Sequence, residues 1–211
     1  MKITIIYDNT AFREDLRSSW GFSALVETKE KQILFDTGGN GSILLSNMQT
    51  LGIDPQQISD VFISHSHFDH TGGLSSFLEQ NRDVILWVPP SFRGVKQVKE
   101  VMEVKTPRMM YEGIYSTGEL EGIEQSLCVD TEKGIVIVAG CSHPKMKRIL
   151  EAAAQFGEVY GIIGGLHGNK PESLKDLDLI CATHCSQYIS KIKALYPDKC
   201  VQGGAGRVIE I

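Results

Sequence analysis

The chain has 211 residues and a formal net charge of −5. This size favours one domain over residues 1–211, and the acidic balance disfavours a nucleic-acid-binding surface, which is usually basic. No run of about 18 apolar residues predicts a membrane span, no secretion signal is recognisable, and the five cysteines do not suggest a disulfide framework. We therefore expect a cytoplasmic protein that acts on a small molecule and does not bind nucleic acid or membranes. The sequence leaves open whether it forms a homo-oligomer.

The first half of the chain predicts more strands than helices. Strands are expected at residues 2–7, 22–28, 31–36, 60–64 and 84–88, with one helix at 41–51 and another after residue 74. The strand segments are rich in Ile, Val and Phe and are bounded by turn residues, whereas residues 41–51 have apolar residues at helical spacing. Residues 95–128 mix charged and apolar residues with glycines, which indicates strands without clear bounds.

The second half alternates strands with helices. Strands are expected at 134–140, 159–163, 179–182 and 207–211, and helices at 145–156 and near 186–195. Pro144 precedes the first of these helices, where proline fits the first helical turn. The whole pattern indicates the α/β class.

Side chains that bind metals cluster just after the predicted strands. The segment His65-Ser66-His67-Phe68-Asp69-His70 follows strand 60–64, and the other three histidines of the chain, His143, His167 and His184, each follow a strand as well. Asp36 ends a further strand. Neighbouring strand ends lie side by side along a sheet edge, so these side chains can converge. Imidazole and carboxylate groups suit zinc and other first-row metals, and the sequence therefore predicts a metal site.

The same residues resemble the metallo-beta-lactamase superfamily. The His-x-His-x-Asp-His signature corresponds to His65, His67, Asp69 and His70, the Asp-Thr-Gly motif begins at Asp36, and two later motifs resemble Gly140-Cys141-Ser142-His143 and Thr183-His184-Cys185. Within that superfamily the chain looks most like the branch of pterin-methyl-ribofuranosylaminobenzene-phosphate synthase-like proteins and metal-dependent hydrolases. That closer match rests on Trp20-Gly21-Phe22-Ser23, Gly140-Cys141-Ser142-His143, Gly164-Gly165-Leu166-His167 and Gly204-Ala205-Gly206-Arg207-Val208-Ile209.

The resemblance implies an αββα sandwich, in which two mixed β-sheets lie face to face with helices outside, and a binuclear metal site at one edge. His65, His67 and His143 would hold one divalent metal, and Asp69, His70 and His184 the second. Zinc is the leading expectation, with iron or manganese as alternatives. Asp36 would orient a metal-binding histidine. Asp69 and His167 are the candidate catalytic residues: Asp69 would accept a proton from water, and His167 would act as a general acid, a further metal ligand or a substrate contact.

The function expected from this resemblance is hydrolysis of an ester or phosphoester bond in a small, anionic substrate by metal-bound hydroxide. A transferase acting on a phosphorylated ribose compound, like the pterin synthases, is the alternative. A third possibility, from another class, is an iron or iron–sulfur redox protein using Cys141, Cys181, Cys185 and Cys200 as ligands.

The chain departs from the superfamily pattern at one ligand. Most members place an Asp after the third motif, where it bridges two metals, but this chain has none there and offers His167 at that strand end. A neutral imidazole cannot bridge two cations as a carboxylate does. The second metal position is therefore expected to be weaker, differently occupied or absent.

Overall fold

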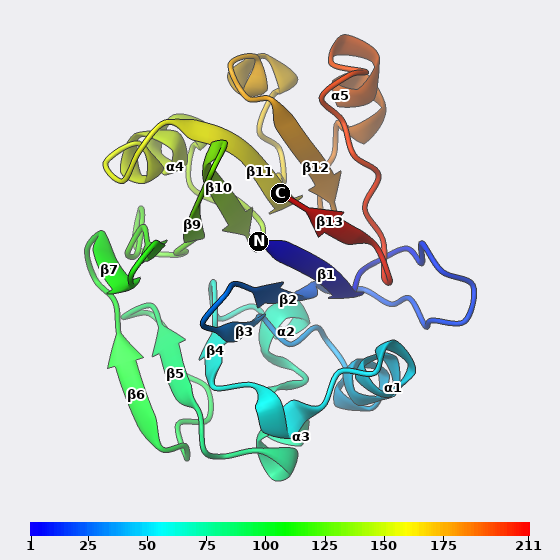
Figure 1. Ribbon diagram of the computed structural model, residues 1–211, viewed down its shortest axis with the longest axis vertical. Coiled ribbons are helices and arrows are strands. Elements are labelled where there is room, and N and C mark those ends of the chain that lie inside the picture. Colours follow the sequence, from blue (N-terminus) through cyan, green and yellow to red (C-terminus); the bar gives the residue numbers. More distant parts are fainter.

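The computed structural model describes residues 1–211 and contains two β-sheets packed face to face (Figure 1). The first sheet has the strand order β13-β1-β2-β3-β4-β5-β6. Its strands are β1 (Lys2–Tyr7), β2 (Ser23–Glu27), β3 (Gln32–Phe35), β4 (Asp60–Phe62), β5 (Ile85–Val88), β6 (Glu100–Glu103) and β13 (Val208–Glu210). Strands β1, β2, β3 and β13 pair antiparallel, whereas β3 to β6 run parallel.

The second sheet has the order β12-β11-β10-β9-β8-β7 and is also mixed. Its strands are β7 (Arg108–Tyr111), β8 (Ile114–Ser116), β9 (Leu127–Thr131), β10 (Gly134–Ala139), β11 (Val159–Gly165) and β12 (Leu179–Thr183). The first three strands form an antiparallel meander that continues into β10, and β10, β11 and β12 are parallel. The segment 95–128, whose strands had no clear bounds in the sequence, thus carries β6, β7, β8 and the start of β9.

Helices cover the outer face of each sheet. The α-helices are α1 (Gly41–Leu51), α2 (Phe68–Thr71), α3 (Leu74–Gln80), α4 (Met146–Ala153) and α5 (Ile189–Leu195), and two short 3₁₀ turns are η1 (Pro55–Gln57) and η2 (Pro171–Leu174). Side chains of α1 and α3 share a core with the first sheet, and those of α4 and α5 share one with the second. Figure 1 shows these two pairs of helices on opposite sides of the molecule. The predicted αββα sandwich is confirmed.

Strand β10 shows how its sequence determines its place between these layers. Val136 and Val138 face the core between the sheets, while Ile135 and Ile137 face the helices. All four are fully buried, which explains the unbroken apolar run, because a strand covered on both faces needs no polar alternation.

Two helices are shorter than expected from the sequence. The helix expected over 145–156 ends at Ala153, and the one expected near 186–195 begins at Ile189. In the second case Ser186 closes a turn instead, because its backbone N–H and its hydroxyl both donate to the Thr183 carbonyl. A side chain that offers the backbone a local partner favours such turns over a helix. No helix of this structure has the length and apolar character that crossing a membrane requires.

Candidate metal centre

Three histidines form the first candidate metal position. His65 follows β4, His67 precedes helix α2, and His143 follows β10; one ring nitrogen from each lies within 4.8 Å of the other two. The ring centroids of His65 and His67 are 4.6 Å apart, and each lies 4.8 Å from that of His143. Three imidazoles with one open side match the ligand count of a catalytic zinc position.

A second group adjoins the first. It contains Asp69 and His70 from α2 and His184 from the end of β12. Asp69 Oδ2 lies 3.3 Å from His184 Nε2 and 3.8 Å from His70 Nε2. The structure thus brings together all six residues that the resemblance predicted as metal ligands, in the two groups of three that were expected.

Two of the imidazoles carry buried nitrogen atoms that fit a metal ion. His65 Nε2 and His184 Nε2 are buried and make no hydrogen bond in the structure, although His184 Nε2 lies 3.3 Å from Asp69 Oδ2, its neighbour in the second group. Their opposite nitrogens are engaged, because His65 Nδ1 lies 2.9 Å from Ser64 Oγ and His184 Nδ1 lies 3.0 Å from Asn9 Oδ1. Buried polar atoms are almost always paired, and an imidazole held through one nitrogen presents the other to a metal. The residues present therefore fit a metal centre.

Asp36 connects strand β3 to both ligand groups. Its Oδ1 accepts a hydrogen bond from Ser64 N at 2.7 Å, and its Oδ2 contacts Ser64 Oγ at 2.6 Å and His70 Nδ1 at 2.7 Å, all in a fully buried setting. Burial opposes charge on His70, but the Asp36 carboxylate outweighs this and holds the pKa of His70 above its ordinary value. In this position Asp36 fixes the His70 ring with Nε2 toward the cluster.

Two further buried carboxylates support the site, and sequence reasoning missed both. Glu124 precedes β9 and accepts hydrogen bonds from the backbone N–H groups of Cys141 and Ser142 on Oε1, at 2.9 and 3.0 Å, and of His143 on Oε2, at 2.8 Å. It is 1% exposed and therefore determines the course of the loop that carries His143. No motif marked this residue, since a glutamate in an irregular segment is usually solvated.

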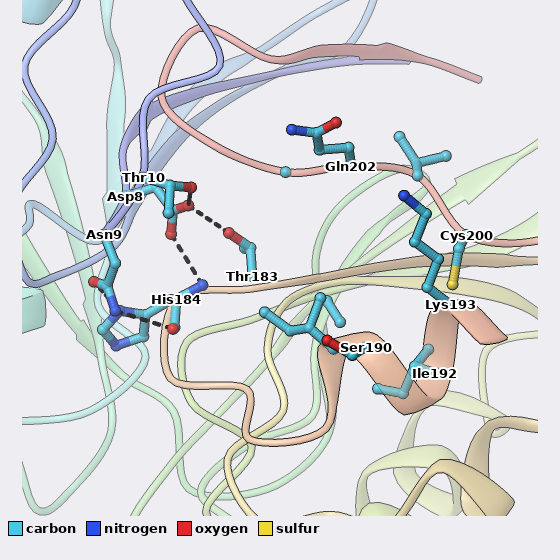
Figure 2. Close-up of a pocket in the computed structure, with 14 residues that line it drawn as sticks. Asp8, Asn9, Thr10, Thr183, His184, Ser190, Ile192, Lys193, Cys200 and Gln202 are labelled. Carbon is cyan, nitrogen blue, oxygen red and sulfur yellow. Dashed lines mark hydrogen bonds between the residues drawn. The ribbon is translucent and has the colours of Figure 1, made fainter. Parts of the chain in front are cut away.

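Asp8 plays the same part for the His184 loop (Figure 2). It follows β1, is buried, and accepts hydrogen bonds from Thr183 Oγ1 on Oδ2 at 2.6 Å and from His184 N on Oδ1 at 2.9 Å. The neighbouring Asn9 donates its side-chain amide to the His184 carbonyl at 3.0 Å. Asp8 and Thr183 also line a cavity of about 420 Å³ between this loop, helix α5 and the segment 200–203. Of the six residues in the two ligand groups only His184 lines this cavity, so the cavity lies beside the metal centre.

The ligand loops contain unusual backbone conformations. Five residues other than glycine have a left-handed φ angle, and four of them lie within three residues of a strand end at this edge: Asp36, Ser142, His167 and His184. Such conformations are unfavourable for side chains with a Cβ and persist where the surroundings enforce them. Here the buried carboxylates supply that constraint for Asp36, Ser142 and His184.

The protonation states favour ligands that are ready for a cation. Burial and the nearby imidazoles hold the pKa of His65 well below its ordinary value and lower that of His143 to about 4. For Asp69, burial alone would raise the pKa, but His184 and His70 outweigh it and hold the pKa below the usual range. Two neutral imidazoles and an ionised carboxylate are the forms that bind metals.

His167 lies at the exposed edge of the cluster. Its ring centroid is 4.9 Å from that of His143, and it does not join the groups of mutually close ligand atoms. The structure thus places His167 where it is open to solvent and to a substrate.

The four cysteines proposed as extra ligands do not converge. Cys141 and Cys185 approach the metal-binding side chains and form a group with His184. Cys181 is instead fully buried between the two sheets, and Cys200 packs at the margin of the core beneath α5. Cys181 and Cys200 thus lie apart from the candidate ligand groups, because they are on or beside the body of β12 and not at its end. An iron–sulfur cluster usually needs four ligands, most often cysteines.

Two exposed aromatic side chains flank the centre. Trp20 is 63% exposed and Phe68 is 73% exposed, and Gly39 lies between them, close to the Trp20 carbonyl and the Phe68 ring. The Trp20 ring centroid is 5.3 Å from that of His184. Large exposed aromatics next to polar groups are typical of binding sites.

Comparisons with known proteins agree with this fold. The sequence profile of the metallo-beta-lactamase superfamily matches residues 21–98, which include Asp36 and the segment His65–His70. The structure of Tm1679, described as a metal-dependent hydrolase of the beta-lactamase superfamily, covers 100% of this chain and 99% of its own, with a TM-score of 0.83 and 23% identity. Human tRNase Z, short form, covers 100% of this chain and 99% of its own, with a TM-score of 0.64 and 15% identity.

A curated relative supports the narrower resemblance. The 7,8-dihydropterin-6-methyl-4-(beta-D-ribofuranosyl)-aminobenzene-5'-phosphate synthase of Methanocaldococcus jannaschii is 27% identical over an alignment that covers 88% of this chain and 87% of that protein. The chain therefore has the metallo-beta-lactamase fold, and it resembles that superfamily in sequence, including the pterin-synthase branch.

Proposed function

We propose that the protein is a metal-dependent hydrolase of ester or phosphoester bonds. The observation that carries this proposal is the pair of adjoining three-ligand groups, His65/His67/His143 and Asp69/His70/His184, with two buried imidazole nitrogens left without partners. When bound, divalent metals in such a site acidify a water molecule and stabilise charge on the reacting oxygens. We expect zinc or iron in this role, because the donor set is dominated by imidazole.

Other residues of the chain would orient a ligand, transfer a proton and contact the substrate. Asp36 keeps the His70 ring in the orientation that points Nε2 toward the other candidate ligands, through the 2.7 Å contact with Nδ1. His167, exposed beside His143, is placed to give a proton to a leaving group or to contact the substrate. Trp20 and Phe68 offer apolar surface on which the organic part of a substrate can rest.

The test is turnover of generic phosphodiester and carboxylic ester substrates by the metal-loaded chain. His67→Ala removes an exposed imidazole, so it should leave the fold intact while metal content falls and turnover disappears. His167→Ala should keep the metal content and lose about 100-fold or more in turnover, as expected for loss of an acid–base group. Full activity of His67→Ala would contradict the hydrolase proposal, and full activity of His167→Ala would remove the catalytic role of that residue.

A synthase-type transferase is the second candidate. It is favoured by the relative from M. jannaschii, whose match extends over 88% of this chain. The exposed Trp20 and Phe68 suit an aromatic substrate group as well as an aliphatic one. This alternative predicts that a phosphorylated pentose raises the melting temperature of the metal-loaded chain and that generic esters are poor substrates. Absence of any thermal shift with such a compound, together with rapid ester hydrolysis, would eliminate it.

A further inference from the structure

Cys141 lies where the two candidate metal positions meet. Its Sγ is 3.1 Å from His70 Nε2, and the residue is 3% exposed. It is close to His65 and His70 in one group of metal-capable atoms and to His184 and Cys185 in another. Each of these two groups contains one histidine whose Nε2 makes no hydrogen bond: His65 in the first group and His184 in the second.

The surroundings of Cys141 differ from those of the structural cysteines. Cys128 and Cys181 are members of the apolar cores. Cys141 is equally buried, but it is not part of any of the three apolar clusters, and its sulfur faces imidazole nitrogen. A buried thiol in the core acts as a small apolar group, whereas a thiol facing several imidazoles has the setting of a metal ligand.

The ligand set also lacks an anion at this place. Among the side chains gathered in the metal-capable groups, Asp69 is the one carboxylate. A ligand shared by two cations must be anionic and must offer more than one lone pair, and a thiolate sulfur meets both conditions. At the end of β11, the strand end at which most superfamily members carry a bridging Asp, Gly165 has no side chain, and a Cβ there would come 2.8 Å from Cys185 Sγ. The loops that carry Cys141 and Cys185 therefore occupy the space that a side chain at position 165 would need.

We propose that Cys141 is a thiolate ligand shared by the two metal positions and replaces the bridging carboxylate. On metal binding the Cys141 S–H bond breaks, a sulfur–metal bond forms, and the proton leaves to solvent. Cys185 is the weaker candidate for this role, because it is only half-buried, is near one group alone, and directs its thiol toward the Cys141 carbonyl at 3.7 Å. A sulfur ligand shifts selectivity toward zinc, iron and cobalt and away from magnesium and manganese. This inference rests on the metal centre of the proposed function.

Cobalt provides a test that does not depend on turnover. The metal-free full-length chain is titrated with Co²⁺ under reducing, anaerobic conditions, and the near-ultraviolet sulfur-to-cobalt charge-transfer band is recorded together with the bound cobalt per chain. Wild type and Cys200→Ser, which removes a thiol outside every metal-capable group, should show the same band. Cys141→Ser should lose most of the band and bind about half as much cobalt, whereas Cys185→Ser should keep most of it.

The outcomes separate the alternatives. A band that survives in Cys141→Ser, or that disappears only in Cys185→Ser, would overturn the proposal. If Cys141→Ser does not fold by circular dichroism, X-ray absorption of zinc-loaded Cys185→Ser decides. A sulfur shell at about 2.3 Å supports the proposal, and nitrogen and oxygen alone at about 2.0–2.1 Å refute it.

The result also distinguishes this inference from the proposed function. Cobalt binding with turnover but without the band would refute the thiolate and leave the hydrolase intact. A charge-transfer band without turnover of any ester would support the thiolate ligand and refute the hydrolase function. Failure to bind cobalt would refute both the thiolate ligand and the metal-dependent hydrolase.

Discussion

Replacing Glu124 with glutamine should weaken the His143 metal position and leave its neighbour unchanged. In the native chain Oε1 accepts from Cys141 N and Ser142 N, and Oε2 accepts from His143 N. A glutamine of the same shape keeps an acceptor for the first two donors but places an N–H₂ group against the third. One charge-assisted hydrogen bond is lost and a donor is left facing a donor, which we expect to reduce the free energy of unfolding by about 1–3 kcal/mol.

The effect on metal binding follows from the same bond. The displaced N–H belongs to His143 itself, so the ring moves relative to His65 and His67. Loss of a residue that orients a metal ligand typically reduces affinity by about 10–100-fold. Asp69, His70 and His184 are held by other contacts and should retain their affinity. Glu124→Ala is less informative, because it leaves three N–H groups unpaired at about 1–3 kcal/mol each, a sum comparable with the whole stability of a domain.

The assay uses urea unfolding of the metal-free chain and competition with a chromophoric chelator for zinc. Glu121→Gln is the matched control, since it makes the same chemical change three residues away on an exposed side chain. Glu124→Gln should lower the unfolding midpoint and weaken one of two zinc equivalents. If both measurements match those of Glu121→Gln, Glu124 does not position the loop and the reasoning is refuted.

Three further outcomes are expected. Asp36→Asn places an amide N–H against His70 Nδ1 and favours the tautomer with the proton on Nε2, so zinc affinity should drop about 10–100-fold; calorimetry that finds unchanged affinity would contradict this. Trp20→Ala should raise KM several-fold with unchanged metal content, and an unaltered KM would exclude Trp20 from substrate binding. The pKa of His143 lies near 4, against an ordinary 6.5, so between these values the unfolded chain binds a proton that the folded chain does not. Metal-free protein should therefore lose stability as the pH falls through that window. This loss of stability at low pH should be smaller in His143→Gln. If the denaturant midpoints of wild type and His143→Gln change equally with pH, His143 is not the group responsible.

The strands and the convergence of the candidate ligands could be predicted from local patterns, whereas the αββα arrangement was expected from the family resemblance. Apolar runs such as residues 134–139 identify buried strands, and residue types with metal chemistry stand directly after them. Helix α1 was bounded correctly by its apolar spacing, and the structure shows a capping Asn40 and a left-handed Gly52 at its ends. The carboxylates that hold the loops were not predictable. Asp8 and Glu124 lie 176 and 19 residues from the histidine N–H groups that they accept, and no local pattern records such a pairing.

The three buried carboxylates show why the site is arranged as it is. Asp8, Asp36 and Glu124 each accept hydrogen bonds from a different ligand-bearing loop, and each is almost fully buried. A buried anion needs either hydrogen-bond donors or a nearby cation. Backbone N–H groups satisfy Glu124, and His184 N with the Thr183 hydroxyl satisfies Asp8, so these two residues position the loops whether or not metal is bound. Asp36 also accepts from Ser64, but in addition it pairs with His70, a group that a metal must hold in its neutral form, so metal charge takes over the balance that the His70 proton provides in the metal-free chain. Metal binding should therefore release a proton from the Asp36–His70 pair, and Asp36 is the carboxylate that links the charge of the metal centre to the stability of the fold.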